Sequence, residues 1–221
     1  MNWLWIVLLS IWQDWLFIWL LNKPPSPFPR HQSSCFMRLY EQAGQALLCR
    51  DIDAKLAQTD ALHRGWRLGR VELEDDCSVH PVDNPGRPER PLLVHPSKVE
   101  RRKLGSVEGR AVLIYDIAHI EFNAVNLVLD AVHRFRGLPP DYYGDWLRVA
   151  QEEASHFRLL RSRLTALGFQ YGDFTAHDGL WAMAVKTADD PLAQMALVPR
   201  IPEARGAQCD AWHQGQVTQG G

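Results

Sequence analysis

Two long stretches of this chain, residues 106–135 and 141–167, repeat apolar side chains with the period of an α-helix. Gly137 and the pair Pro139–Pro140 separate the two stretches, and Gly168 follows the second as a helix stop signal. The pattern predicts two long helices that lie next to each other in the chain.

Shorter helices are predicted further on. Residues 178–186 have a helical pattern, and another helix begins after Pro191, which suits a first helical turn, and runs towards Arg205. No convincing strand pattern occurs beyond residue 105. These features predict an all-α protein, a helical bundle built from residues 105–206.

The preceding part of the chain, residues 37–104, divides into two regions. Residues 37–66 have helical spacing that breaks at Gly65. Residues 76–103 contain five prolines, which exclude regular structure and predict a long strap lying over the body. The strap ends in a basic run, residues 98–103, which is typical of a solvated face and leaves local nucleic-acid contact open. The net charge of −2 gives no global field for nucleic acid.

Both long helices place a carboxylate among their apolar residues. Steps of three, four and seven from Glu121 return the apolar residues Ile114, Ile117, Ala118, Ala124, Val125 and Val128. The same steps from Glu153 return Trp146, Val149, Ala150, Phe157 and Leu160. His156 shares the face of Glu153, whereas Glu152 turns towards the surface and His119 points away from Glu121.

A buried carboxylate needs a cation, a hydrogen-bond network or a proton, because an isolated ionised group in an apolar core is very costly. Glu-x-x-His on one helix and Glu on its neighbour is the arrangement with which helical bundles bind two iron or manganese ions. The alternative is a non-enzymatic helical module, in which Arg136, Arg148 or Arg200 pairs with the buried carboxylates and the protein acts by binding partners.

Four long motifs resemble the signature of a bacterial family with a ferritin-like domain, the domain of unknown function 455. They are Ala118-His-Ile-Glu-Phe-Asn-Ala-Val-Asn-Leu127, Asp145-Trp-Leu-Arg-Val-Ala-Gln-Glu-Glu-Ala-Ser-His-Phe157, Tyr171-Gly-Asp-Phe-Thr-Ala-His-Asp-Gly-Leu-Trp181 and Met195-Ala-Leu-Val-Pro-Arg-Ile-Pro-Glu-Ala-Arg-Gly206. The resemblance covers residues 38–206 and is specific because the motifs follow one another over the whole region.

The resemblance implies a ferritin-like bundle with a carboxylate-bridged pair of iron or manganese ions. It assigns Glu121, Glu153, His156 and Glu203 as metal ligands and makes His177 a candidate to support them or to act as an outer ligand. A loop histidine satisfied by backbone groups is the alternative for His177. The related di-iron proteins include oxidases, hydroxylases and a tRNA-modifying hydroxylase, so an oxidoreductase of unknown substrate is expected.

The sequence departs from the family pattern after Gly206. No second Glu-x-x-His follows Glu203, so the fourth core helix is expected to be missing and the chain to be truncated or frameshifted there. Residues 207–221 are predicted to be a disordered tail. Three helices would leave an apolar face uncovered, which predicts a homo-oligomer or aggregation. An inactive, damaged copy of the family protein is therefore a further interpretation.

The first 21 residues are almost wholly apolar, with Asp14 as their one charge. Two interpretations stay open: a single membrane anchor with the body on the cytoplasmic side, or a misplaced start, with Met37 as the true one. Residues 22–36 read as a proline-rich linker. The four cysteines are widely spaced, which indicates reduced thiols in a reducing compartment.

Overall fold

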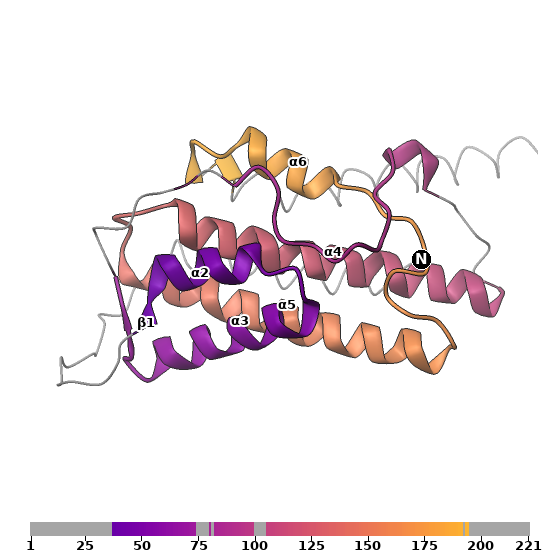
Figure 1. Cartoon of the computed structure of the whole chain (residues 1–221), viewed down its shortest axis with the longest axis horizontal. Helices are drawn as coiled ribbons and strands as arrows, with labels where there is room; N and C mark the ends of the chain where they lie inside the picture. Colours follow the sequence, from indigo (N-terminus) through magenta and orange to yellow (C-terminus); the bar gives the residue numbers. More distant parts are fainter. Residues whose placement is uncertain (1–36, 74–79, 81, 100–104, 192, 195–221) are drawn as a thin grey trace, which may run out of the picture. The chain divides into compact units, whose positions relative to one another are not determined.

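The computed structural model describes residues 37–73, 80, 82–99, 105–191 and 193–194. Residues 37–189 form a mostly helical body (Figure 1). Its helices are α2 (Leu39–Leu48), α3 (Ile52–Arg67), α4 (Val107–Arg134), α5 (Pro140–Ala166) and α6 (Gly179–Lys186). A 3₁₀ turn, η1 (Pro96–Lys98), and two paired short strands, β1 (Met37–Arg38) and β2 (Val71–Glu72), complete it.

The two long helices begin and end where their sequence signals lie. The Ser106 hydroxyl accepts a hydrogen bond from the N–H of Gly109 at 2.9 Å and so caps α4. Pro140 opens α5, where its missing N–H costs no hydrogen bond. Gly168 follows α5 with a φ of +87°, the left-handed conformation that ends many helices. The predicted helix boundaries are therefore confirmed.

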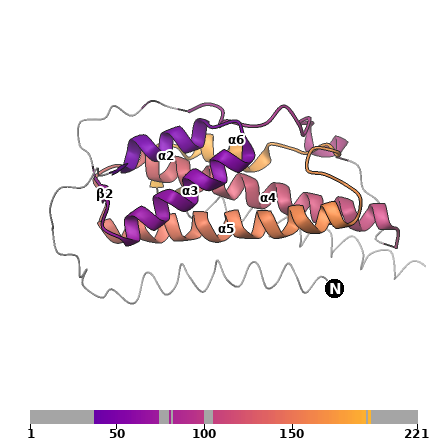
Figure 2. The same ribbon diagram turned by 60° about the horizontal axis from the view of Figure 1, so that its bottom comes forward.

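Four of the helices pack as a bundle. α4 and α5 run antiparallel, α2 packs on α4, α3 packs on α5, and α2 and α3 pack on each other (Figures 1 and 2). Their shared core consists of buried apolar residues from all four helices, joined by one residue of the strap and one of α6: Ala46, Leu47, Leu56, Val82, Ala118, Phe122, Val125, Leu129, Ala154, Phe157 and Trp181. The prediction of an all-α bundle is confirmed.

The described part of the strap, residues 82–99, contacts α2, α6 and the loop before α6, and backbone groups take part in these contacts. The N–H of Gly86 donates to the carbonyl of Leu47 at 2.8 Å, and the indole N–H of Trp181 donates to the carbonyl of Asp83 at 2.7 Å. A single β-bridge joins Leu93 to Ala176. Because prolines exclude a ladder or a long helix, these separate contacts replace regular structure.

The prediction that the first helical region breaks at Gly65 is wrong. α3 continues through Gly65 to Arg67, and Gly69, with a φ of +63°, follows its end. A Cβ on Gly65 would meet the terminal methyl group of the flexible Met37 side chain and would lie 3.1 Å from Cγ2 of Val71, so β1 and β2 both have side chains close to this glycine. The two-residue strands were not predicted, because two residues are too short for an alternating pattern to register.

Residues 190–194 belong to a separate unit of the chain, and the start of the predicted helix is present there. The Asp190 carboxylate accepts a hydrogen bond from the N–H of Ala193 at 3.2 Å, and the Asp190 carbonyl accepts one from Gln194. The remainder of this helix, the apolar segment and linker of residues 1–36 and the tail of residues 207–221 lie outside the described residues.

Among the described residues, α4 is the one helix whose length and composition would suit a membrane span, and 72 % of its apolar window is buried inside the protein. Its hydropathy is explained by its central place in the bundle.

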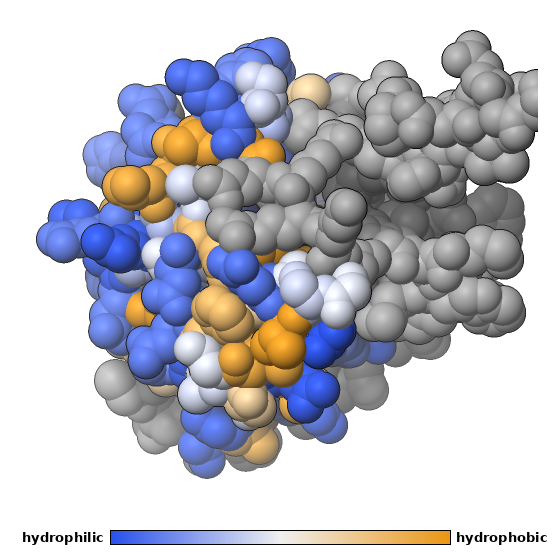
Figure 3. Space-filling model, turned by 90° about the vertical axis from the view of Figure 1, so that its right-hand side faces the viewer, coloured by the Kyte–Doolittle hydropathy of each residue, from blue (hydrophilic) through white to orange (hydrophobic). Residues whose placement is uncertain are grey.

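Seen from the end where α4 begins and α5 ends, apolar side chains form small clusters between hydrophilic ones (Figure 3).

Candidate metal centre

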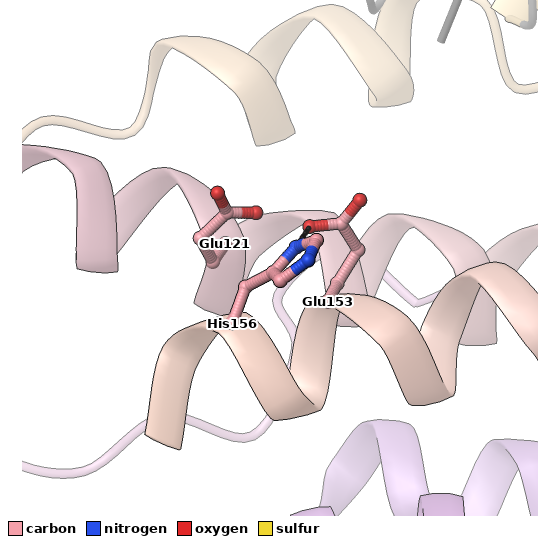
Figure 4. A group of neighbouring side chains, drawn as sticks. All are labelled: Glu121, Glu153 and His156. Atoms are coloured by element: carbon pink, nitrogen blue, oxygen red, sulfur yellow. Dashed lines mark hydrogen bonds and ion pairs between the residues drawn. The ribbon is translucent and has the colours of Figure 1, made fainter. Parts of the chain in front are cut away.

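Glu121 on α4 and Glu153 and His156 on α5 come together between the two long helices. One ligand atom from each residue lies within 4.8 Å of the other two. The Nδ1 atom of His156 is 3.3 Å from Oε2 of Glu153, and the two side chains reach towards the Glu121 carboxyl group (Figure 4). The sequence prediction named these three residues, and the fold brings them to one place.

The cluster borders the core of the four-helix bundle. Phe122 and Phe157 pack against each other in that core, with ring centroids 5.4 Å apart. Phe122 directly follows Glu121 in the chain, and Phe157 lies about one helical turn after Glu153. The cluster therefore lies beside the aromatic contact.

Burial makes the cluster electrostatically unusual. Glu121 and Glu153 are each 5 % exposed, whereas the His156 side chain is 35 % exposed. Loss of solvent, followed by the hydrogen bond and the repulsion from Glu153, raises the pKa of Glu121 far above its usual range. The hydrogen bond from His156 to Glu153 raises the pKa of the imidazole against the opposing effect of its burial. Without a cation, the raised pKa favours the protonated form of Glu121.

The donor atoms of the three residues could hold a metal ion. Two carboxyl groups in contact can each give oxygen ligands, and the imidazole gives a nitrogen ligand once it has lost its proton. A cation between the carboxylates would also remove the repulsion that now requires a proton. The three residues could therefore hold a metal ion, with His156 on the more open flank.

The remaining predicted site residues lie elsewhere or outside the described chain. The Nδ1 atom of His177 accepts a hydrogen bond from the N–H of Gly179 at 3.2 Å, at the start of α6, and His177 is not among the converging ligands. Glu203 lies outside the described residues. The Glu152 carboxylate is 4.0 Å from Arg148 on the surface of α5, in agreement with its predicted orientation.

The arginines proposed as alternative partners for the carboxylates make other contacts. The guanidinium of Arg136 lies over the ring of Tyr40, 4.1 Å from its centroid, and its Nε donates to the carbonyl of His133. Arg148 pairs with Glu152. Arg200 lies outside the described residues.

The opposite side of α4 carries a row of buried polar residues that the sequence analysis missed. His119, Asn123, Asn126, Asp130 and His133 are each at most 7 % exposed. Their spacing of three or four residues places them on one helix face, and this repeat is the signal that could have revealed them. We refer to them as the polar seam.

Each end of the polar seam is held by hydrogen bonds. At one end, His119 Nδ1 is 2.8 Å from the hydroxyl of Tyr171, and Asn123 contacts His119 Nε2 at 3.0 Å. At the other end, His133 Nδ1 is 2.9 Å from the carbonyl of Tyr40. In the middle, the ammonium of Lys55 donates to Asn126 Oδ1. The seam therefore fixes α2, α3 and the loop after α5 to α4.

The fold and the cluster define a helical-bundle protein with two buried glutamates and a histidine gathered between its two longest helices. The chain belongs to the family described as Protein of unknown function (DUF455), whose model matches residues 48–214. The match continues past Gly206, where the sequence analysis expected the resemblance to end.

A relative from Haemophilus influenzae (strain ATCC 51907 / DSM 11121 / KW20 / Rd), described as an uncharacterized protein, is 48 % identical over 157 residues. The aligned region is 67 % of this chain and 54 % of that protein, so the chain spans about half the length of this relative. No solved structure matches the chain.

Proposed function

We propose that this protein is a ferritin-like metalloprotein that binds a carboxylate-bridged pair of iron or manganese ions and acts as an oxidoreductase, an oxidase or hydroxylase of a substrate not yet identified. The observation that carries the proposal is the gathering of two buried glutamates and one histidine, whose ligand atoms all lie within 4.8 Å of one another. Such a pair needs a cation, a hydrogen-bond network or a proton to be stable in a core.

Each residue would contribute to metal binding according to its position. Glu121 and Glu153 would hold the metal with carboxylate oxygens from two different helices, and His156 would add a nitrogen ligand from the open flank. Glu203 is proposed as a further carboxylate ligand on the strength of the family resemblance. A bound iron or manganese pair would supply redox chemistry towards dioxygen.

A structural network of arginines is the competing explanation for the buried carboxylates. Arg136 lies over the ring of Tyr40, and Arg148 pairs with Glu152, so each of these two guanidinium groups has at least one partner other than the buried carboxylates. The experiment must also distinguish the metal-bound protein from a metal-free protein in which the two carboxyl groups share one proton.

The test is metal analysis of the purified full chain after anaerobic loading with Fe²⁺ or Mn²⁺ and removal of unbound ions. Wild-type protein is expected to retain metal in stoichiometric amounts. The variants Glu121→Gln and Glu153→Gln are expected to lose it, because each replaces a charged ligand with a neutral amide of the same size.

Glu152→Gln is the matched control, since it makes the same chemical change one residue away, on the surface of α5. It should retain the wild-type amount of metal. Absence of retained metal in the wild-type protein, or equal retention in Glu153→Gln and Glu152→Gln, would refute the proposal.

A further inference from the structure

A cavity of about 550 Å³ lies between the strap and α4, away from the metal cluster. Residues 84–89 and 91–93 of the strap form one wall, and His119 and Phe122 of α4 form part of the other. None of Glu121, Glu153 and His156 lines it. The volume lies in the range of about 300–1,000 Å³ that is typical of small-molecule sites.

The lining of the cavity is largely apolar, and its rim is open. Leu48, Leu92 and Leu93 line it and are 55 %, 65 % and 41 % exposed, which makes them three of the large apolar side chains left exposed on the described surface. Phe122 and Tyr171 lie deeper, with ring centroids 5.9 Å apart. An apolar ligand body in this cavity would remove the exposed leucines from water.

Two arginines line the same cavity, and their side chains differ in the contacts that they make. Arg87 is half-buried and paired: its Nη2 is 2.5 Å from Asp178 Oδ1 and 3.4 Å from Asn123 Oδ1. Arg50 is exposed, and its Nε donates to the carbonyl of Arg87 at 3.3 Å. That hydrogen bond anchors the Arg50 side chain to the strap and leaves its two terminal amino groups for another acceptor, which suits a carboxylate.

One acidic residue, Glu89, also lines the cavity and is exposed. Its charge opposes an anionic ligand, so the acidic group of the ligand must sit at the Arg50 side of the rim. The opposed charges of Arg50 and Glu89 at one opening would then set the orientation of the ligand as well as its affinity.

We propose that this cavity binds a small amphipathic carboxylate, a hydrocarbon body with one acidic group, with the body against Leu48, Leu92 and Leu93 and the carboxylate on Arg50. The site is separate from the proposed metal centre and does not depend on it. Arg87 acts as a positioning residue, because its carbonyl holds Arg50 while its guanidinium ties the strap to α4 and α6.

The test is calorimetric titration of the full chain with decanoate, below the concentration at which decanoate forms micelles, and in parallel with decanol. Saturable decanoate binding at one site per chain is expected, with decanol weaker. Arg50→Gln should weaken decanoate binding about tenfold, as expected for the loss of a charge-assisted contact, and leave decanol binding nearly unchanged. Glu89→Gln should strengthen decanoate binding.

Two matched substitutions separate the cavity from general surface effects. Leu48→Asp places a charge on the rim and should abolish measurable binding, whereas Leu159→Asp makes the same change at an exposed position of α5 that does not line the cavity, and should leave binding intact. The metal-site variant Glu121→Gln should bind decanoate like the wild type. Absence of saturable binding, equal affinities for Arg50→Gln and wild type, or equal losses in the two aspartate variants would overturn the proposal.

Discussion

The Nδ1 atom of His156 lies 3.3 Å from Oε2 of Glu153, one helical turn earlier on α5. This contact links the half-exposed member of the cluster to a buried carboxyl group and raises the pKa of the imidazole. A proton on His156 and a metal ion on His156 therefore compete for the same nitrogen lone pairs.

We expect Glu153→Gln to lower the pKa of His156 in the metal-free protein. Since the folded-state pKa of His156 is raised, its interaction with Glu153 stabilises the protein below the unfolded-state pKa, and this contribution is lost as the pH rises through the folded-state value. NMR titration of the His156 ring in the wild type and in Glu153→Gln measures the change. Glu152→Gln serves as control, with a smaller decrease expected because Glu152 is a lesser cause of the shift. Equal pKa values in wild type and Glu153→Gln would contradict the prediction.

The metal-free protein should become less stable as the pH rises, and Glu121→Gln should remove much of this dependence. Burial raises the folded-state pKa of Glu121 above that of a free glutamate, so its protonated form stabilises the fold at low pH and this contribution is lost as the pH rises towards the folded-state pKa. Urea unfolding of metal-free wild type and Glu121→Gln between about pH 5 and pH 8 tests this. The stability advantage of the variant should grow with pH, and a constant difference would count against a protonated Glu121.

The helices and the cluster were predictable because their signals are local. The stripe around Glu121 and the Glu153–His156 spacing lie within single helices, and Ser106, Pro140 and Gly168 define the helix ends. The convergence of Glu121 with Glu153 needed one further step, the pairing of two helices joined by a short turn. Both kinds of information are contained in a single contiguous stretch of sequence.

What could not be predicted depends on partners distant in the chain. His119 was set aside because it faces away from Glu121, yet Tyr171, 52 residues later, gives its ring a hydrogen bond. The function of Gly65 as a site of close approach depends on Met37, and nothing near Gly65 in the sequence identifies that contact. Buried polar residues form hydrogen bonds with the element that packs against them. Their spacing in the sequence alone does not predict which element that is.

Lys55 provides a test of the polar seam. Its side chain is fully buried, and its ammonium donates to the carbonyls of Leu47 and Gly86 and to Asn126 Oδ1, so it joins α2, the strap and α4. Lys55→Met should lower the free energy of unfolding by about 3 kcal/mol, because three buried acceptors lose the hydrogen-bond donor that they share. Urea denaturation measures the loss. Lys186→Met, at an exposed position on α6, should change stability by less than about 0.5 kcal/mol, and a similar small effect for Lys55→Met would contradict this account.

Gly86→Ala should destabilise the protein by displacing the strap. A Cβ at this position would overlap the backbone carbonyls of Leu48 and Cys49, and backbone atoms cannot rotate away as a side chain can. The displaced strap would lose the hydrogen bond from Gly86 to Leu47 and the one from Lys55 to Gly86. We expect a loss of about 2–3 kcal/mol in urea unfolding. Gly105→Ala is the matched control, because a Cβ there meets nothing within 4 Å. The Gly86→Ala variant should therefore be clearly less stable than the Gly105→Ala variant. Equal stabilities of the two variants would show that the strap can move without a loss of stability.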